Sequence, residues 1–215
     1  MAISTRQGDF VESYHKPLTP ELERLRLENE NAGIPLILKE TEDMLSMLLS
    51  LKKPGHILEI GTAQGYSALF FASRCPDACV VTIEKEDSMA EVAELNFNNS
   101  PCAGRIELLH GDAEEVLSNH IFKNKFDFVF IDAGKTHYRE YFSLAEKLCN
   151  PGAIIVCDNI LISGWIYDRT LPGAKRHRTN VKYMKSFLEY INNREDLTVA
   201  LSSSGDGLAI IKLDD

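Results

Sequence analysis

The chain has 215 residues, of which 44% are hydrophobic and 26% are charged, and its mean hydropathy is −0.16. This is the balance of a globular domain, and it excludes disordered, collagen-like and coiled-coil proteins. A membrane-spanning helix needs about 20 apolar residues, and no apolar run in the sequence approaches that length. The opening sequence MAISTRQGDF also lacks the apolar region of a secretion signal, so we expect a cytoplasmic protein with no membrane partner.

The charge and the cysteines exclude further classes. The net charge is −9, from 32 acidic against 23 basic residues, and such a chain is a poor general coat for nucleic acid. The five cysteines are odd in number and contain no C-x-x-C pair, which argues against a disulfide framework and against a structural zinc site.

The first 54 residues show helical patterns and no convincing strand. One helix is predicted over 20–31, where a proline opens the pattern and Gly33 ends it. A second is predicted over 35–51 from apolar residues at helical spacing. We expect residues 1–54 to form a helical cap on the same domain that residues 55–215 build.

From residue 55 onward, short apolar runs alternate with amphipathic segments. The predicted strands are 56–60, 79–84, 105–110, 126–132 and 152–158, and the predicted helices between them are 65–74, 86–98, 113–120 and 137–148. Five such repeats imply crossover connections and a parallel sheet covered on both faces. A helix at 179–193 and a strand hairpin around 204–206 complete the chain.

The residues just after the strands are expected to carry the chemistry, because open α/β sheets bind ligands beyond the carboxyl ends of their strands. The first strand leads into EIGTAQGYS, where Gly61 and Gly65 permit a tight turn. A dinucleotide fingerprint needs glycines at 63 and 66, which are Ala and Tyr here, so a pyrophosphate cradle is disfavoured. Glu84 ends the second strand, where a carboxylate can accept both ribose hydroxyls of a nucleoside.

A second constellation consists of Asp132, Asp158 and Asn159 at the ends of the fourth and fifth strands. If these strands are neighbours, the three side chains meet. Two carboxylates and an amide oxygen are hard ligands that suit Mg²⁺, Ca²⁺ or Mn²⁺. The alternative is that Asp132 caps the next helix and Asp158-Asn159 forms a turn.

Six segments in order resemble a known family: LEIGTAQGYSA, VVTIEKE, LLHGDAEE, FDFVFIDAGKTHY, PGAIIVCDN and GDGLAI. They are similar to class I S-adenosylmethionine-dependent O-methyltransferases of the metal-dependent branch, which contains the catechol and caffeoyl-CoA enzymes. Bacterial members that methylate 5-hydroxyuridine in tRNA look most similar. The resemblance covers roughly residues 30–213 and implies a Rossmann-like α/β fold, with a mostly parallel seven-stranded sheet and an antiparallel C-terminal strand.

The resemblance also implies roles for individual residues. Glu59 and Gly61 would lie under the methionine part of the cofactor, and Ser67 would hold its carboxylate. Glu84 would bind the ribose. The remaining cofactor residues would be Asp112 and Ala113 beside the adenine, Ile37 as a cover, and Asp132. The same likeness assigns Asp132, Asp158 and Asn159 as metal ligands, and Lys135 as the base that removes the acceptor proton.

The acceptor is predicted from the segment after the fifth strand. Residues 169–185 contain six Lys or Arg and no acid, so the rest of the chain carries −9 − 6 = −15. With Trp165, the basic residues Lys175, Arg176 and Arg178 could hold phosphates and stack a base, which favours tRNA as the substrate. The alternatives are a small catechol or hydroxycinnamoyl-thioester phenol, with the basic segment an ordinary loop or a contact in the homodimer that the family usually forms.

Two other classes explain less of the sequence. A nicotinamide oxidoreductase would share the sheet and Glu84. It would need the middle glycine of the fingerprint, which this chain lacks, and it would not explain the Asp-x-x-Lys and Asp-Asn pair. A noncatalytic RNA-binding cofactor sensor has no need for Lys135 and three metal ligands.

Overall fold

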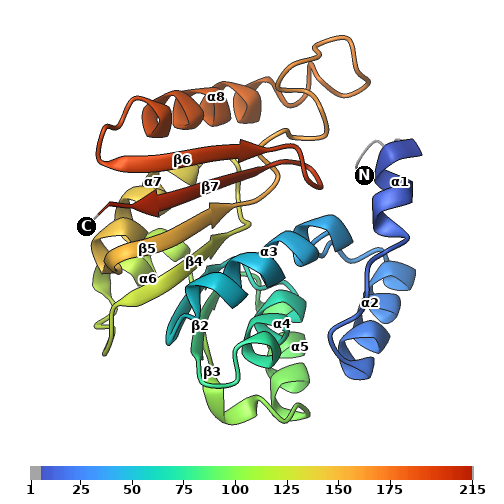
Figure 1. The fold of residues 1–215 in the computed structure, drawn as a ribbon, viewed down its shortest axis with the longest axis vertical. Coiled ribbons are helices and arrows are strands. Elements are labelled where there is room, and N and C mark those ends of the chain that lie inside the picture. The colour runs from blue at the N-terminus through green and yellow to red at the C-terminus, as the bar shows by residue number, and fades with distance from the viewer. Residues whose placement is uncertain (1–5, 215) are drawn as a thin grey trace.

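The computed structural model describes residues 6–214, which form one seven-stranded sheet flanked by helices (Figure 1). The strand order is β3-β2-β1-β4-β5-β7-β6. The strands are β1 (His56–Ile60), β2 (Cys79–Glu84), β3 (Ile106–His110), β4 (Phe126–Ile131), β5 (Cys149–Cys157), β6 (Leu197–Ser202) and β7 (Leu208–Leu213). Every strand predicted from the sequence is present, with bounds that differ by at most three residues at either end.

The first five strands run parallel, and the last two form an antiparallel hairpin. β7 pairs antiparallel with β5, and β6 lies at the edge beyond it. The predicted Rossmann-like fold is therefore confirmed. The strand order reverses direction between β1 and β4, which is the point where an open α/β sheet forms a ligand crevice.

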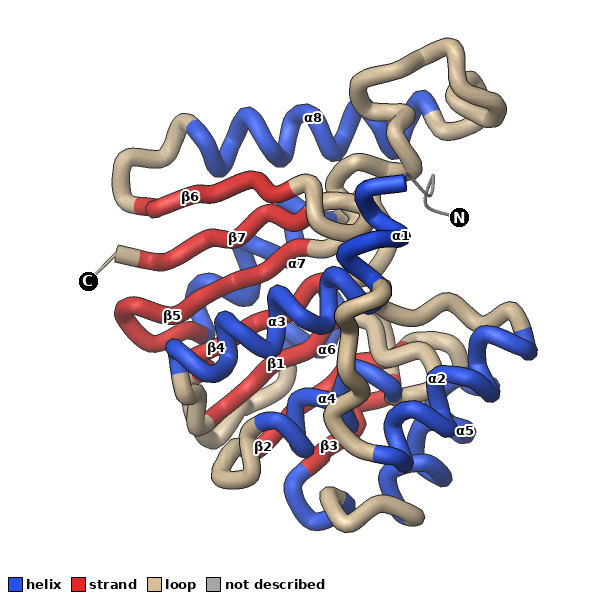
Figure 2. Tube along the Cα trace, turned by 45° about the vertical axis from the view of Figure 1, so that its right-hand side comes forward, coloured by secondary structure: helices blue, strands red, loops and turns tan. Residues whose placement is uncertain are grey.

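Helices cover both faces of the sheet, as Figure 2 shows. The helices are α1 (Arg6–Glu12), α2 (Pro20–Ala32), α3 (Lys39–Lys52), α4 (Tyr66–Arg74), α5 (Asp87–Asn98), α6 (Ala113–Asn119), α7 (Tyr138–Ala145) and α8 (Arg178–Asn192). Two separate apolar clusters result, one beneath α2 to α5 and one beneath α6 to α8. The near-continuous apolar runs of β1 and β4 follow from this, since both of their faces are buried.

Two features of the N-terminal part differ from the sequence prediction. The second helix begins at Lys39 rather than at residue 35, because Gly33 ends α2 in a left-handed conformation and Leu38 is still extended. Residues 34–38 are a connecting segment, and α1 precedes α2 as a helix that the sequence patterns did not reveal. Within residues 6–214, no helix is long and apolar enough to cross a bilayer.

A buried polar network joins α2, α3 and α4. Arg26 is 2% exposed, and its Nη2 donates to Glu42 Oε2 at 2.6 Å. The Tyr66 hydroxyl donates to the same carboxylate oxygen at 2.6 Å, while Arg26 Nη1 donates to the backbone oxygen of Ile37 at 3.1 Å. The guanidinium thus fixes the segment 34–38 as well as the helices, and burial of the ion pair makes each partner depend on the other.

Removing the arginine tests this network. Arg26→Met leaves Glu42 as a buried charge without its main partner, so we expect the free energy of unfolding to fall by about 3 kcal/mol or more. Arg24→Met is the control, because Arg24 lies on the same helix with its side chain 74% exposed in a pair with Glu28. That variant should change stability by less than about 0.5 kcal/mol in urea denaturation. Equal losses in the two variants would contradict the interpretation.

Candidate active site

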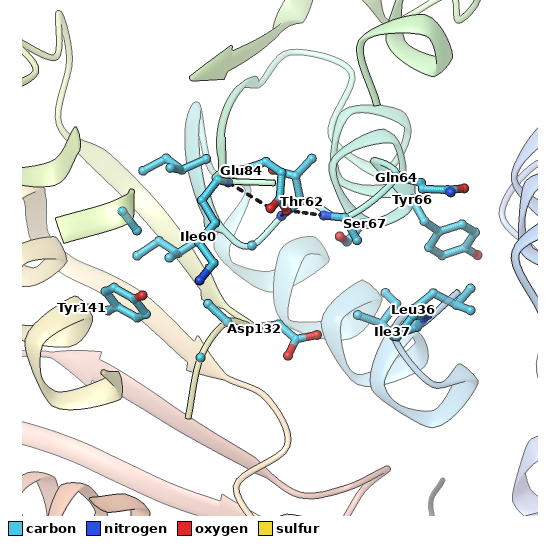
Figure 3. Close-up of a pocket in the computed structure, with 18 of the residues that line it drawn as sticks. Leu36, Ile37, Ile60, Thr62, Gln64, Tyr66, Ser67, Glu84, Asp132 and Tyr141 are labelled. Carbon is cyan, nitrogen blue, oxygen red and sulfur yellow. Dashed lines mark hydrogen bonds between the residues drawn. The ribbon is translucent and has the colours of Figure 1, made fainter. Parts of the chain in front are cut away.

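A hollow of about 250 Å³ lies at the carboxyl ends of β1, β2 and β4; we call it the central hollow (Figure 3). Its walls come from the turn after β1, the start of α6, the residues after β4 and the segment 34–38. Six of the eight residues predicted to contact a cofactor line it: Ile37, Gly61, Ser67, Glu84, Ala113 and Asp132. Ile37 and Leu36 face Asp132 across the hollow, so the segment fixed by Arg26 forms one wall.

The floor of the central hollow depends on a close backbone approach at Gly61. Gly61 has a φ of +98°, and a Cβ atom there would lie 2.2 Å from the backbone oxygen of Asp132. The Asp132 amide donates to the Ile60 oxygen at 3.0 Å, which extends the pairing of β1 with β4. Only glycine fits, and the turn after β1 therefore lies directly against the end of β4.

Glu84 holds the wall formed by the turn after β1. Its Oε2 accepts the backbone N–H groups of Thr62 at 3.1 Å and Ala63 at 2.8 Å. Its Oε1 accepts those of Lys85 and Glu86, both at 2.9 Å. The carboxylate is 8% exposed, so these four bonds satisfy a buried charge. Glu84 thus builds the hollow in addition to facing it.

The two other residues predicted to contact a cofactor lie outside the central hollow. Glu59 is fully buried beneath it, and its Oε2 accepts a hydrogen bond from the Thr82 hydroxyl. Burial raises the pKa of Glu59 to about 7, against the lowering effect of Ser67 and Thr82. The Asp112 side chain accepts from the Glu114 amide and caps α6, while its neighbours Gly111 and Ala113 line the hollow.

The sequence patterns did not single out several of the lining residues. Thr62 and Gln64 lie inside a motif quoted for its glycines, and Tyr141 lies in α7, in a predicted helix for which the sequence assigned this residue no role. Tyr66 and Asn29 line the hollow from α4 and α2. Only the packing of α2 over α4 brings this last pair together, so local patterns could not predict it.

The predicted metal ligands meet at the edge of the central hollow. Asp132 Oδ1 accepts from Asn159 Nδ2 at 2.8 Å and from Lys135 Nζ at 2.9 Å. The Asn159 backbone N–H donates to Asp158 Oδ1 at 2.6 Å. β4 and β5 are adjacent, as the sequence prediction required. No group of three or more His, Cys, Asp or Glu that could hold a metal occurs among residues 6–214, and this cluster contains two carboxylates with one amide.

Asp158 and Tyr138 give the cluster its electrostatics. Asp158 is 2% exposed, and burial together with the charge of Asp132 raises its pKa. Tyr138, the first residue of α7, donates its hydroxyl to the Asp158 backbone oxygen at 2.8 Å. The same hydroxyl accepts from Lys135 Nζ at 2.8 Å, so a buried phenol orients the lysine beside Asp132.

The basic segment 169–185 spans the end of the long connection between β5 and α8 and the first turns of α8, which begins at Arg178. The connection projects from the molecule near α1 in both views (Figures 1 and 2). Lys175, Arg176 and Arg178 are exposed, and no ion pair with another described residue involves them. Trp165 stacks on His177 with centroids 4.0 Å apart, and its Nε1 donates to the Pro172 oxygen at 3.0 Å. One face of the indole is therefore covered from within the connection.

A second, larger cavity of about 860 Å³ is lined in part by the loop that follows Asn159, and we call it the outer cavity. It is bounded by α1, by the start of α3, by residues 161–167 and by the β6–β7 turn at 202–206. Tyr167, which is 69% exposed, stands at its wall. The volume of the outer cavity is in the range of about 300–1,000 Å³ that ligand pockets typically enclose.

Comparison with known proteins identifies the family. A model of the O-methyltransferase family matches residues 11–213. The chain belongs to this family. It is 32% identical over 155 residues to a catechol O-methyltransferase of Niastella koreensis, covering 67% of this chain and 70% of that one. A caffeoyl-CoA O-methyltransferase of Populus kitakamiensis is 32% identical over 178 residues, covering 78% and 74%.

A solved structure extends the likeness to the whole fold. An O-methyltransferase from Bacillus cereus in complex with SAH superposes with a TM-score of 0.83 at 27% identity, covering 98% of each chain. The predicted resemblance to S-adenosylmethionine-dependent O-methyltransferases of the catechol and caffeoyl-CoA type is therefore confirmed.

The buried Glu59 makes a pH-dependent contribution to stability. Its pKa is about 7 in the folded protein and near 4.5 without burial, so the folded state retains a proton that the unfolded chain releases. Stability should fall by about 3 kcal/mol from this group as the pH rises from 4.5 to 7. In urea denaturation, the free energy of unfolding of Glu59→Gln should lack this fall between pH 4.5 and pH 7. Glu107→Gln, at an exposed position of β3, should retain it, and an unchanged profile in Glu59→Gln would contradict the assignment.

Proposed function

We propose that this protein transfers a methyl group from S-adenosylmethionine in the central hollow to an acceptor hydroxyl beside Asp132, Asp158 and Asn159, with a divalent cation. The observation that carries the proposal is the double position of Asp132. It lines the central hollow and also accepts hydrogen bonds from Lys135 and Asn159. A donor in the hollow and an acceptor at the cluster would then be held next to each other, and such alignment is the main requirement of methyl transfer.

The side chains of the cluster fit a divalent cation. Asp132, Asp158 and Asn159 offer two carboxylates and an amide oxygen, which are the hard donors that Mg²⁺, Ca²⁺ and Mn²⁺ prefer. Asp158 is buried beside the charge of Asp132, and a bound cation would offset the repulsion that raises its pKa. Open coordination positions would suit a substrate with two adjacent oxygens.

The chemistry divides between the cation and the chain. When bound, the cation supplies electrostatic stabilisation of a deprotonated acceptor oxygen. Lys135 accepts the hydroxyl proton at Nζ, and Tyr138 and Asp132 orient that atom through bonds of 2.8 and 2.9 Å. The acceptor oxygen then forms a bond to the methyl carbon as the carbon–sulfur bond breaks, which leaves a methyl ether and S-adenosylhomocysteine.

For the acceptor, we propose 5-hydroxyuridine in tRNA, whose 5-hydroxyl lies beside the O4 carbonyl. The exposed, unpaired Lys175, Arg176 and Arg178 support this, because phosphates require a cationic surface near the reacting base. A small phenol with vicinal oxygens is the second candidate. The names of the relatives, catechol and caffeoyl-CoA O-methyltransferases, favour it.

The lysine and the cation have a common test. We expect Lys135→Met to lower methyl transfer by about 100-fold or more, because proton removal would lose its base, with S-adenosylhomocysteine affinity retained. Lys123→Met, at an exposed position between α6 and β4, should have normal activity. Chelation of divalent cations with EDTA should stop turnover of the unmodified protein, and Mg²⁺ should restore it. Undiminished turnover with EDTA would refute the cation's role.

The acceptor is tested by methyl transfer from labelled S-adenosylmethionine to tRNA containing 5-hydroxyuridine, and separately to catechol and caffeoyl-CoA. We expect label in the tRNA and little in the phenols. Replacing Lys175, Arg176 and Arg178 by Gln should raise the KM for tRNA and weaken its salt dependence. The paired variant Lys123→Gln with Lys125→Gln lies at the amino end of the central strand β4, whereas the site lies at the carboxyl ends of the strands. It removes two positive charges far from the site and should leave the KM for tRNA and its salt dependence unchanged. Label only in the phenols would establish the second candidate.

A further inference from the structure

The loop that follows β5 has an unusual backbone. Asn159, Ile162 and Ser163 have φ values of 57°, 51° and 53°, and Gly164 has 83°. Residues other than glycine adopt this left-handed region only at a cost, most of all when β-branched as isoleucine is. Three of them within five positions require support from outside the loop, because local preferences oppose the conformation.

The support comes from the turn between β6 and β7. Both carboxylate oxygens of Asp206 accept the Ser163 N–H, each at 2.8 Å. The Asp206 backbone oxygen accepts the Leu161 N–H at 2.9 Å, and the Gly207 oxygen accepts the Ile160 N–H at 3.1 Å. These bonds continue the antiparallel pairing of β5 with β7 beyond the ends of both strands.

The contact between the turn and the loop is tight as well as polar. Gly207 has a φ of +84°, and a Cβ atom there would lie 2.4 Å from Leu161 Cγ. The turn can approach the loop this closely only with glycine at 207. Asp206 and Gly207 belong to the GDGLAI segment, for which the sequence suggested no residue role.

The conformation of the loop decides where Asn159 lies. With a φ of 57°, Asn159 turns its side chain to Asp132, where Nδ2 donates to Oδ1 at 2.8 Å. Its own amide meanwhile donates to Asp158 Oδ1. A loop that relaxed to ordinary backbone angles would move the Asn159 side-chain amide away from Asp132 and its backbone N–H away from Asp158.

We infer that Asp206 is a positioning residue of the cation site: it holds the 159–164 loop in its strained conformation, so that Asn159 meets Asp132 and Asp158. The inference rests on the proposed cation site but concerns a residue outside its ligand set. Asp206 also lines the outer cavity together with Leu161 and Ser163, so the same contact fixes the wall that an acceptor would face.

Asp206→Asn tests the inference, because the amide keeps one accepting oxygen but replaces the other with a nitrogen that cannot accept the Ser163 N–H. We expect Mn²⁺ affinity, measured by electron paramagnetic resonance, to fall by about 10-fold or more. Hydrogen exchange at the Leu161 and Ser163 amides should accelerate, while S-adenosylhomocysteine affinity in calorimetry should stay within about twofold. Asp168→Asn is the matched control, since Asp168 accepts from the Thr170 amide in the same connection.

A second substitution separates positioning from charge. Glycine adopts the left-handed region without steric cost, so Ser163→Gly should restore part of the Mn²⁺ affinity of Asp206→Asn. Absence of any recovery would mean that Asp206 acts on the cation through its charge, which would overturn the positioning role. Unchanged Mn²⁺ binding in Asp206→Asn would overturn it too, as would equal loss of S-adenosylhomocysteine binding.

The failure of the proposed function would look different. If the unmodified protein bound no Mn²⁺, the cation mechanism itself would be refuted. Hydrogen exchange of Asp206→Asn without metal would still decide whether Asp206 holds the 159–164 loop. Faster exchange at the Leu161 and Ser163 amides supports this role, and unchanged exchange refutes it.

Discussion

The contact between Gly61 and the backbone of Asp132 is the constraint on which the arrangement of the site depends. A Cβ atom at 61 would overlap the Asp132 oxygen, so the turn after β1 can reach the end of β4 only without a side chain. This approach places the central hollow and the acidic cluster on either side of Asp132. A donor and an acceptor bound on those two sides would be neighbours because two parallel strands end at the same edge of the sheet.

The site buries several carboxyl groups, and hydrogen bonds from the chain offset part of the desolvation cost of their charges. Glu84 is satisfied by four backbone N–H groups, and Asp132 by Lys135 and Asn159. Asp158 and Glu59 lack comparable compensation, and burial raises the pKa of each. Groups with perturbed pKa values cluster at functional sites, and these two carboxyl groups lie at and beneath the candidate site.

Elements outside the five parallel strands hold the site in shape. The Arg26–Glu42–Tyr66 network fixes the segment that carries Ile37 over the central hollow. At the other side, the β6–β7 turn holds the loop that carries Asn159. Both supports are polar and directional, so they specify one conformation for segments whose own backbone preferences do not.

The sequence by itself determined the order of the elements and the main candidate residues. Strands such as β1 and β4 are apolar along their whole length because both faces are buried, and this pattern is local. The adjacency of Asp132 with Asp158 and Asn159 followed from the rule that parallel strands present their carboxyl ends together. Tertiary structure alone decided that residues 34–38 connect two helices and that Glu84 accepts hydrogen bonds from backbone amides. It also decided that His177 stacks on Trp165 and that Asp206 accepts the Ser163 N–H. Most of these contacts join residues far apart in the chain and depend on side-chain packing, for which a periodic pattern carries no information.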